Sequence, residues 1–198
     1  MARASVRVRP ADGTDIPGLI RLSQAVTPSR GGLANQSLDL SVEHLAERFA
    51  EILAEKARTL LVAIDEFSAE VVGLLVARRD EIGAIDLTAV LHVTHLMVLP
   101  DHRRRGVGRA LLTSAVLLAD EVGLDRVLAT AGSGSREANR YLARLGFAPL
   151  TVHRVAPVSV LRRTLGMTEL PERIAVLRRV RLARNQPGGP STRANRGA

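Results

Sequence analysis

The segment that decides the fold runs from Leu91 to Leu112 and has the sequence LHVTHLMVLPDHRRRGVGRALL. Its first half is typical of an apolar strand that ends near Pro100, and its last residues begin a helix. An arginine-rich loop with Gly106 and Gly108 joins the two. Glycines let the backbone approach a ligand closely, and the first amides of a helix point outward toward an anion. The segment therefore predicts a site for a phosphate or a pyrophosphate.

The spacing of this loop differs from two common nucleotide-binding motifs. It lacks the Gly-Lys-Ser/Thr of the lysine-bearing phosphate loop, and Gly106 and Gly108 are not followed by the third glycine of the dinucleotide motif. An R-x-x-G-x-G pattern follows a strand ending in V-L-P, and L-G-F occurs after a helix at residues 145–147. This combination resembles the GNAT superfamily of N-acetyltransferases. The resemblance covers about residues 6–155.

The resemblance implies acetyl-CoA as the co-substrate. In that family the loop after the fourth strand binds the pyrophosphate through backbone amides, and the pantetheine arm pairs with the splayed end of that strand. The pyrophosphate would be bound here by Arg103, Arg104, Arg105, Gly106, Val107, Gly108 and Arg109. Met97 and Val98 would border the acetyl and pantetheine region, with a backbone amide near Val98 facing the oxyanion. An ordinary arginine-rich surface turn is the alternative for this loop.

The second family motif, N-x-x-A-x-x-x-Y-x-x-x-G-F, is only partly present. Aligning Ala138 and the final Gly-Phe pair places Ser135 where the family has an asparagine that contacts the cofactor. Leu142 stands where the family has the tyrosine that protonates the leaving thiolate, and Tyr141 is one residue early, about 100° around the helix. Tyr141 is our candidate acid, with water or Ser135 as substitutes and core packing of the ring as the structural alternative.

His92 is the candidate base. An amine acceptor is mostly protonated near pH 7, so a transferase needs a group or a water chain to remove the proton. Some members of the family place a glutamate or a histidine at the position of His92, and histidine titrates in the required range. Strand alternation would put His92 with Val98 on one face and His95 with Met97 on the other. A core histidine is the alternative, and no metal site is expected, because rings three residues apart on a strand diverge.

The remaining pattern predicts an α/β fold of the α+β type. We expect a mixed, mostly antiparallel sheet of six or seven strands with a central parallel pair, flanked by about four helices. Strands are expected at 5–9, 59–64, 71–77, 89–99, 126–131 and 148–155, and helices at 14–26, 42–57, 108–123 and 135–145. The resemblance implies an acceptor site between loops at 27–40 and 79–87. In the second loop Asp80, Glu81 and Asp86 would attract a cationic amine or would simply be solvated.

Most of the net charge of +8 lies outside this predicted domain. Residues 1–156 hold 19 basic and 18 acidic side chains, whereas residues 157–198 hold 9 and 2. The chain has only four aromatic residues, so a stacking platform for unpaired bases is excluded. We expect an acetyltransferase domain at 1–156, a basic extension at 157–186 with a short helix near 159–165 and a helix or strand at 173–183, and a disordered tail at 187–198.

Two functions fit these observations. The first is an acetyl-CoA-dependent N-acetyltransferase in which a small-molecule or peptide amine attacks the thioester directly in a ternary complex. The second is a catalytically weak acyl-CoA-binding regulatory module that engages nucleic acid or an acidic partner through the basic extension. The chain has no cysteine and no apolar run of membrane-spanning length, so we expect a cytoplasmic protein without disulfides. The acceptor is open, and a homodimer is compatible with the sequence.

Overall fold

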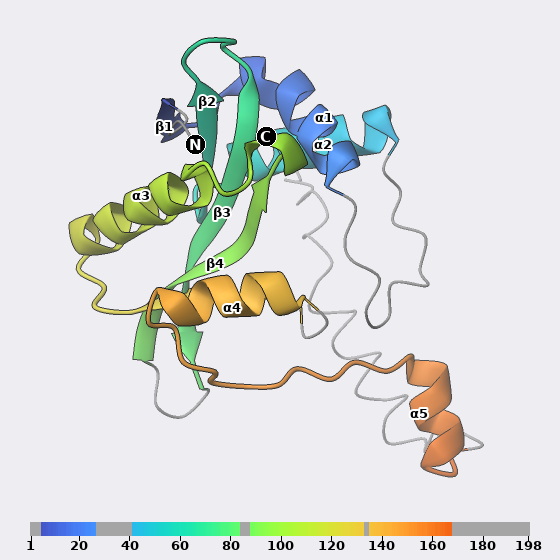
Figure 1. Cartoon of the computed structure of the whole chain (residues 1–198). Helices are drawn as coiled ribbons and strands as arrows, with labels where there is room; N and C mark the ends of the chain where they lie inside the picture. Colours follow the sequence, from blue (N-terminus) through green and yellow to red (C-terminus); the bar gives the residue numbers. More distant parts are fainter. Residues whose placement is uncertain (1–4, 27–40, 84–87, 133–134, 168–198) are drawn as a thin grey trace, which may run out of the picture. The chain divides into compact units, whose positions relative to one another are not determined.

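The computed structural model describes residues 5–26, 41–83, 88–132 and 135–167. The chain divides into two compact units, Met1–Leu150 and Thr151–Ala198. The first unit contains a five-stranded sheet in the order β1-β2-β3-β4-β5 (Figure 1). Its strands are β1 (Val6–Pro10), β2 (Arg58–Asp65), β3 (Val71–Ile82), β4 (Thr88–Val98) and β5 (Val127–Ala129). Strands β1 to β4 pair antiparallel and β4 with β5 parallel, which confirms the predicted mixed sheet; within the described residues it has fewer strands than expected.

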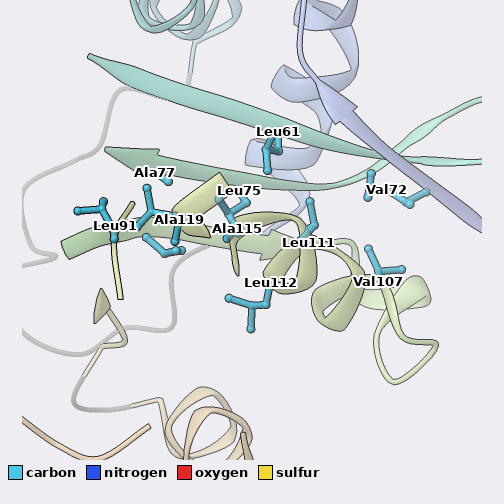
Figure 2. Close-up of a cluster of buried hydrophobic side chains, with 13 residues drawn as sticks. Leu61, Val72, Leu75, Ala77, Leu91, Val107, Leu111, Leu112, Ala115 and Ala119 are labelled. Atoms are coloured by element: carbon cyan, nitrogen blue, oxygen red, sulfur yellow. The ribbon is translucent and has the colours of Figure 1, made fainter. Parts of the chain in front are cut away.

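Helices cover both faces of this sheet. They are α1 (Ile16–Ala25), α2 (Val42–Ala54), α3 (Val107–Glu121) and α4 (Arg136–Arg144), with 3-10 turns η1 (Gly13–Asp15) and η2 (Pro100–His102). Leu19 of α1 and Phe49 of α2 pack with Leu74 of β3 in one core. Leu111 of α3 packs with Leu75 of β3 in the other, which Figure 2 shows in close-up. Strands buried on both faces have nearly continuous apolar runs, as the sequence of β2 and β3 does.

Local signals explain where the helices begin. The Ser41 side chain accepts a hydrogen bond from the His44 amide and caps α2, and the Ser135 side chain accepts from the Ala138 amide and caps α4. Asp12 caps η1, which leads directly into α1. In the second unit, α5 (Val158–Thr164) forms where the sequence predicted a short helix.

Two sequence predictions about strands are wrong. Residues 78–82 continue β3, where we expected a loop, because Asp80, Glu81 and Ile82 pair with Val90, Ala89 and Thr88 of β4. This pairing holds charged residues extended in spite of their low strand propensity. Residues 148–155 form no strand, although their apolar residues alternate. Alternation alone is insufficient, since a strand also needs a neighbour for its backbone hydrogen bonds.

Other predictions fall on residues outside the described ranges. The loop at 27–40, the segment at 173–183 that could be helix or strand, and the tail at 187–198 belong to this group, as does Asp86.

Candidate functional site

The arginine-rich loop after β4 leads into the N-terminus of α3. Gly106 is the N-cap of the helix with φ of +94°, a left-handed conformation that favours glycine, and Arg104 also has a positive φ of +59°. The Ala110 amide donates to the Gly106 carbonyl at 3.0 Å. The preceding amides, those of Val107, Gly108 and Arg109, lie in the first turn, where no intrahelical acceptor exists. Together with the helix dipole they form a favourable anion site.

Close packing against the sheet sets the position of this helix N-terminus. Val107 is only 1% exposed. A Cβ added to Gly73 of β3 would lie 2.9 Å from Val107 Cγ1 and 3.2 Å from the Met97 carbonyl oxygen. The absent side chain at Gly73 therefore lets the first turn of α3 approach the end of β4, which carries Met97 and Val98. Arg103 strengthens this link, because its Nε donates to the Val98 carbonyl at 3.4 Å.

The guanidinium groups of the loop lie near α4. Arg103 and Arg104 are each 4.0 Å from a carboxylate oxygen of Glu137. All three side chains are exposed, so these ion pairs contribute little to stability. Their charges remain available to an anionic ligand.

Strands β4 and β5 separate beyond a short paired stretch. They pair from Leu91 to Val93, and the last backbone bond runs from the Thr130 amide to the Val93 carbonyl at 3.1 Å. A small hollow lies where the strands part. It is lined by Val93, Leu96, Ala129, Thr130, Ala131, Ala138, Tyr141 and Leu142. The hollow is mostly apolar, and Thr130 and Tyr141 are the residues in its lining whose side chains carry a hydroxyl.

Tyr141 brings a hydroxyl to the first turn of α3. Its Oη is buried, has no hydrogen-bond partner among the described residues, and lies 3.4 Å from the position that a Cβ on Gly108 would take. Burial raises the pKa of Tyr141, and the charge of Arg109 opposes this only partly. The hydroxyl thus stays protonated and can donate. Although Tyr141 and Leu142 differ by one position on α4, both line the hollow.

Ser135, the other candidate from α4, is engaged in capping. Its hydroxyl accepts from the Ala138 amide at 3.4 Å. The Asn139 side chain donates to the carbonyls of Gly132 and Ser135 at 3.0 Å and 2.8 Å. These bonds hold the entry of α4 beside the end of β5.

A β-bulge in β4 overturns the expected faces of the two histidines. His95 pairs with Val76 and Val93 with Ala77, so Thr94 is an extra residue on β4. Val93 and Leu96 consequently both pack in the core beneath α3, whereas Met97 packs in the core of α1 and α2. His92 and His95 therefore share the α1 and α2 face, and Val98 lies on the opposite one. Partial desolvation, followed by the charge of Arg58, lowers the pKa of His95.

His92 is held on both sides. Its Nδ1 lies 2.9 Å from Asp80 Oδ2 and its Nε2 lies 2.8 Å from Thr130 Oγ1. Arg78 also reaches the Asp80 carboxylate, at 2.7 Å. The hydrogen bond to His92, followed by that to Arg78, lowers the pKa of Asp80 to about 2. Asp80 is therefore a partner of His92 and does not belong to a free acidic loop.

His102 is a further residue that our sequence analysis did not assign to the site. Its Nε2 lies 3.6 Å from Asp65 Oδ2, and its Nδ1 is buried with no hydrogen-bond partner in the described part of the chain. Hydrogen bonds from the Phe67 and Ser68 amides lower the pKa of Asp65, with a smaller contribution from His102. The contact links the loop after β4 to the turn between β2 and β3. No local motif signals it, because 37 residues separate the partners.

The sequence candidates thus fall into two groups. The loop residues 103–109, Tyr141 and Ser135 gather around the N-termini of α3 and α4, and Met97 and Val98 end β4 beside them. His92 lies at the start of the split between β4 and β5, joined to Asp80 and Thr130. In the described part of the chain no cluster of three His, Asp or Glu side chains could hold a metal ion. None of the described helices is long and apolar enough to cross a membrane.

Comparisons with known proteins agree with this arrangement. The model of the acetyltransferase (GNAT) family matches residues 32–147. No curated protein sequence matches the chain. Solved structures do: a transcriptional regulator from Bacillus halodurans C-125 is 20% identical with a TM-score of 0.64, covering 77% of this chain and 99% of its own.

Two further solved structures are N-acetyltransferases. A glucosamine-6-phosphate N-acetyltransferase from Arabidopsis thaliana is 15% identical with a TM-score of 0.59, over 77% of this chain and 98% of its own. An aminoglycoside N-acetyltransferase in complex with CoA is 16% identical with a TM-score of 0.63, over 77% and 93%. At these identities the likeness establishes the shared fold.

Proposed function

Because the chain belongs to the GNAT acetyltransferase family, we propose that it is an acetyl-CoA-dependent N-acetyltransferase whose acceptor is an amine. The observation that carries this proposal is the first turn of α3. Gly106 in the left-handed region presents three helix amides beside the end of β4. A pyrophosphate matches this site in charge and in hydrogen-bonding capacity.

The cofactor would extend from this turn into the hollow between β4 and β5. Arg103, Arg104, Arg105 and Arg109 add positive charge around the phosphates. The Tyr141 hydroxyl has no hydrogen-bond partner within the residues that the structure describes, and it lies against the same turn. We therefore assign Tyr141 as a hydrogen-bond donor to the bound cofactor, with protonation of the thiolate as its second candidate role.

Direct attack needs a site for the thioester and a group that takes a proton. Acetyl-CoA supplies an activated acetyl group, and a backbone amide near Val98 would stabilise the oxyanion. His92 is the proposed proton acceptor, because it lies where β4 and β5 begin to separate. The paired Asp80 carboxylate stabilises the imidazolium that forms.

The acceptor class is a matter for experiment. Solved structures of the same fold include enzymes named for glucosamine-6-phosphate and aminoglycosides. A thiol-release assay with acetyl-CoA should therefore screen amino sugars, aminoglycosides, polyamines and peptides with free N-termini. We expect at least one amine to release free CoA well above the rate of thioester hydrolysis.

Binding is tested separately by calorimetric titration with acetyl-CoA. We expect saturable binding and a rise in melting temperature, since a ligand that binds only the native state stabilises it. Absence of binding at millimolar acetyl-CoA would overturn the proposed function. Binding without turnover of any amine would instead favour the regulatory acyl-CoA-binding module.

A further inference from the structure

Three strands each contribute one side chain to a continuous hydrogen-bonded chain. Asp80 comes from β3, His92 from β4 and Thr130 from the residue after β5. Asp80 Oδ2 lies 2.9 Å from His92 Nδ1, and His92 Nε2 lies 2.8 Å from Thr130 Oγ1. Both distances are those of good hydrogen bonds.

The direction of these bonds follows from the groups involved. A carboxylate can only accept, so His92 Nδ1 carries the proton that Asp80 receives. In the neutral imidazole Nε2 is then an acceptor, and the Thr130 hydroxyl donates to it. Arg78 fixes the position of the Asp80 carboxylate, because its guanidinium donates a hydrogen bond to Asp80 Oδ2 at 2.7 Å. The order is that of an acid, a histidine and a hydroxyl group, in which the base activates the hydroxyl.

Thr130 places the end of this chain at the split between the strands. Its amide makes the last backbone bond to β4, and the residue lines the hollow. His92 itself lies on the face of α1 and α2, away from the core that Val93 and Leu96 share with α3. Thr130 therefore belongs both to the hydrogen-bonded chain and to the lining of the hollow where the thioester is proposed to lie.

Leu142 occupies the position at which the GNAT motif has a proton-donating tyrosine. It lines the same hollow but carries no proton to donate to a leaving thiolate. We propose that Thr130 is a catalytic residue that relays one proton from the attacking amine to His92 and then from His92 to the departing sulfur. This inference rests on the proposed function and specifies how the proton moves.

The step balances without any further reactant. The neutral amine forms the N–C bond with the thioester carbonyl carbon, and its surplus proton passes to Thr130 Oγ1 as the hydroxyl proton passes to His92 Nε2. The carbonyl then re-forms, and the C–S bond breaks with its electron pair on sulfur. His92 Nε2 returns its proton to Thr130, which passes a proton to the thiolate. The products are the acetylated amine and CoA with a free thiol, and the protein is unchanged.

The test compares Thr130→Val with Thr130→Ser in the thiol-release assay, using acetyl-CoA and the amine with the highest turnover in the panel. Removing the hydroxyl should lower kcat by about 100-fold, within the usual range for a proton-transfer group. The Kd for acetyl-CoA, measured by calorimetry, should change by less than about threefold in both variants. Thr130→Ser should retain kcat within about fivefold. The exposed Thr113→Val on α3 is the matched control and should behave as wild type.

A double variant distinguishes a relay from independent effects. His92→Gln combined with Thr130→Val should be no more than about threefold slower than the slower single variant, because both remove the same proton path. The positioning role of Asp80 has its own readout in the 15N shifts of His92. We expect a protonated Nδ1 in the wild type and loss of that tautomer preference in Asp80→Asn, with the exposed Asp120→Asn as its control.

The outcomes separate the two proposals. A wild type that binds acetyl-CoA but turns over no amine overturns the proposed function, and the relay with it. A wild type that is active, with Thr130→Val retaining kcat within about threefold, overturns the relay alone. The relay is equally wrong if Thr130→Ser is as slow as Thr130→Val, or if the double variant shows the full product of both losses.

Discussion

Adding one methyl group at Gly73 should damage both the fold and the cofactor site. The new Cβ would lie 2.9 Å from Val107 Cγ1, 3.1 Å from Leu111 Cδ1 and 3.2 Å from the Met97 carbonyl oxygen. Val107 is 1% exposed and Leu111 is fully buried, so neither has room to move away. Overpacking of this kind costs about 1–3 kcal/mol. The lower entropy of an unfolded chain with alanine returns up to about 1 kcal/mol.

We therefore expect Gly73→Ala to lower the free energy of unfolding by about 1–2 kcal/mol. For a domain of this size that corresponds to a fall in melting temperature of about 2–8 °C. The contact also pushes the first turn of α3 away from β4, so acetyl-CoA affinity should fall by about fivefold or more, on the order of 1 kcal/mol. Thermal unfolding followed by circular dichroism and calorimetric titration measure the two effects.

Two controls make this prediction sharp. Gly13→Ala introduces a Cβ with no atom within 4 Å, so it should leave acetyl-CoA affinity unchanged and keep or slightly raise the melting temperature. Shortening the clashing side chain in Gly73→Ala/Val107→Ala should cost less than the sum of the two single changes. An unchanged melting temperature together with an unchanged acetyl-CoA affinity in Gly73→Ala would refute the argument that close packing positions the cofactor site.

Three other changes have defined outcomes. Tyr141→Phe removes a buried hydroxyl without a partner, so the free protein should keep its stability or gain up to about 1 kcal/mol in urea unfolding, while acetyl-CoA affinity falls about fivefold. Gly106→Ala forces alanine to a φ of +94°, so calorimetry should show about tenfold weaker binding and thermal unfolding a loss of about 1–2 kcal/mol. Asp80→Asn should destabilise the protein by up to about 1 kcal/mol near pH 6, because hydrogen bonds from His92 and Arg78 lower the pKa of this carboxyl, which is 32% exposed, to about 2. The difference in stability between the variant and the wild type should shrink as the pH falls from about 4 toward 2.

The elements with local signals were predictable from the sequence. Ser41 before an amphipathic run and Gly106 before another mark the starts of α2 and α3, because capping and left-handed geometry depend on one or two residues. Features that need a partner far along the chain were not predictable. The extension of β3 through Asp80 exists because β4 pairs with it, whereas residues 148–155 pair with no other described segment in spite of their alternation.

The same distinction between local signals and distant partners applies to the residues of the candidate site. The proposed phosphate-binding loop is contiguous, so its residues could be named from one segment and its resemblance to the family motif. The partners of His92 could not, since Asp80 precedes it by 12 residues and Thr130 follows it by 38. Asp80, which we had expected in a loop that is solvated or binds the acceptor, is the hydrogen-bond partner of His92, the candidate base.

The Thr94 bulge explains why Val98 and His92 lie on opposite faces of the sheet. Regular alternation would place Val98 on the same face as His92 and would continue the pairing of β4 with β5. The extra residue comes directly after Val93, the last residue of β4 that pairs with β5. A bulge bends its strand and disrupts the ladder locally, so it favours separation at this point. It also turns Leu96 and Val98 toward α3 while His92 stays on the opposite face. The bulge therefore coincides with the point where β4 and β5 separate, which is where Thr130 makes the last backbone bond to β4 and where the hollow lies.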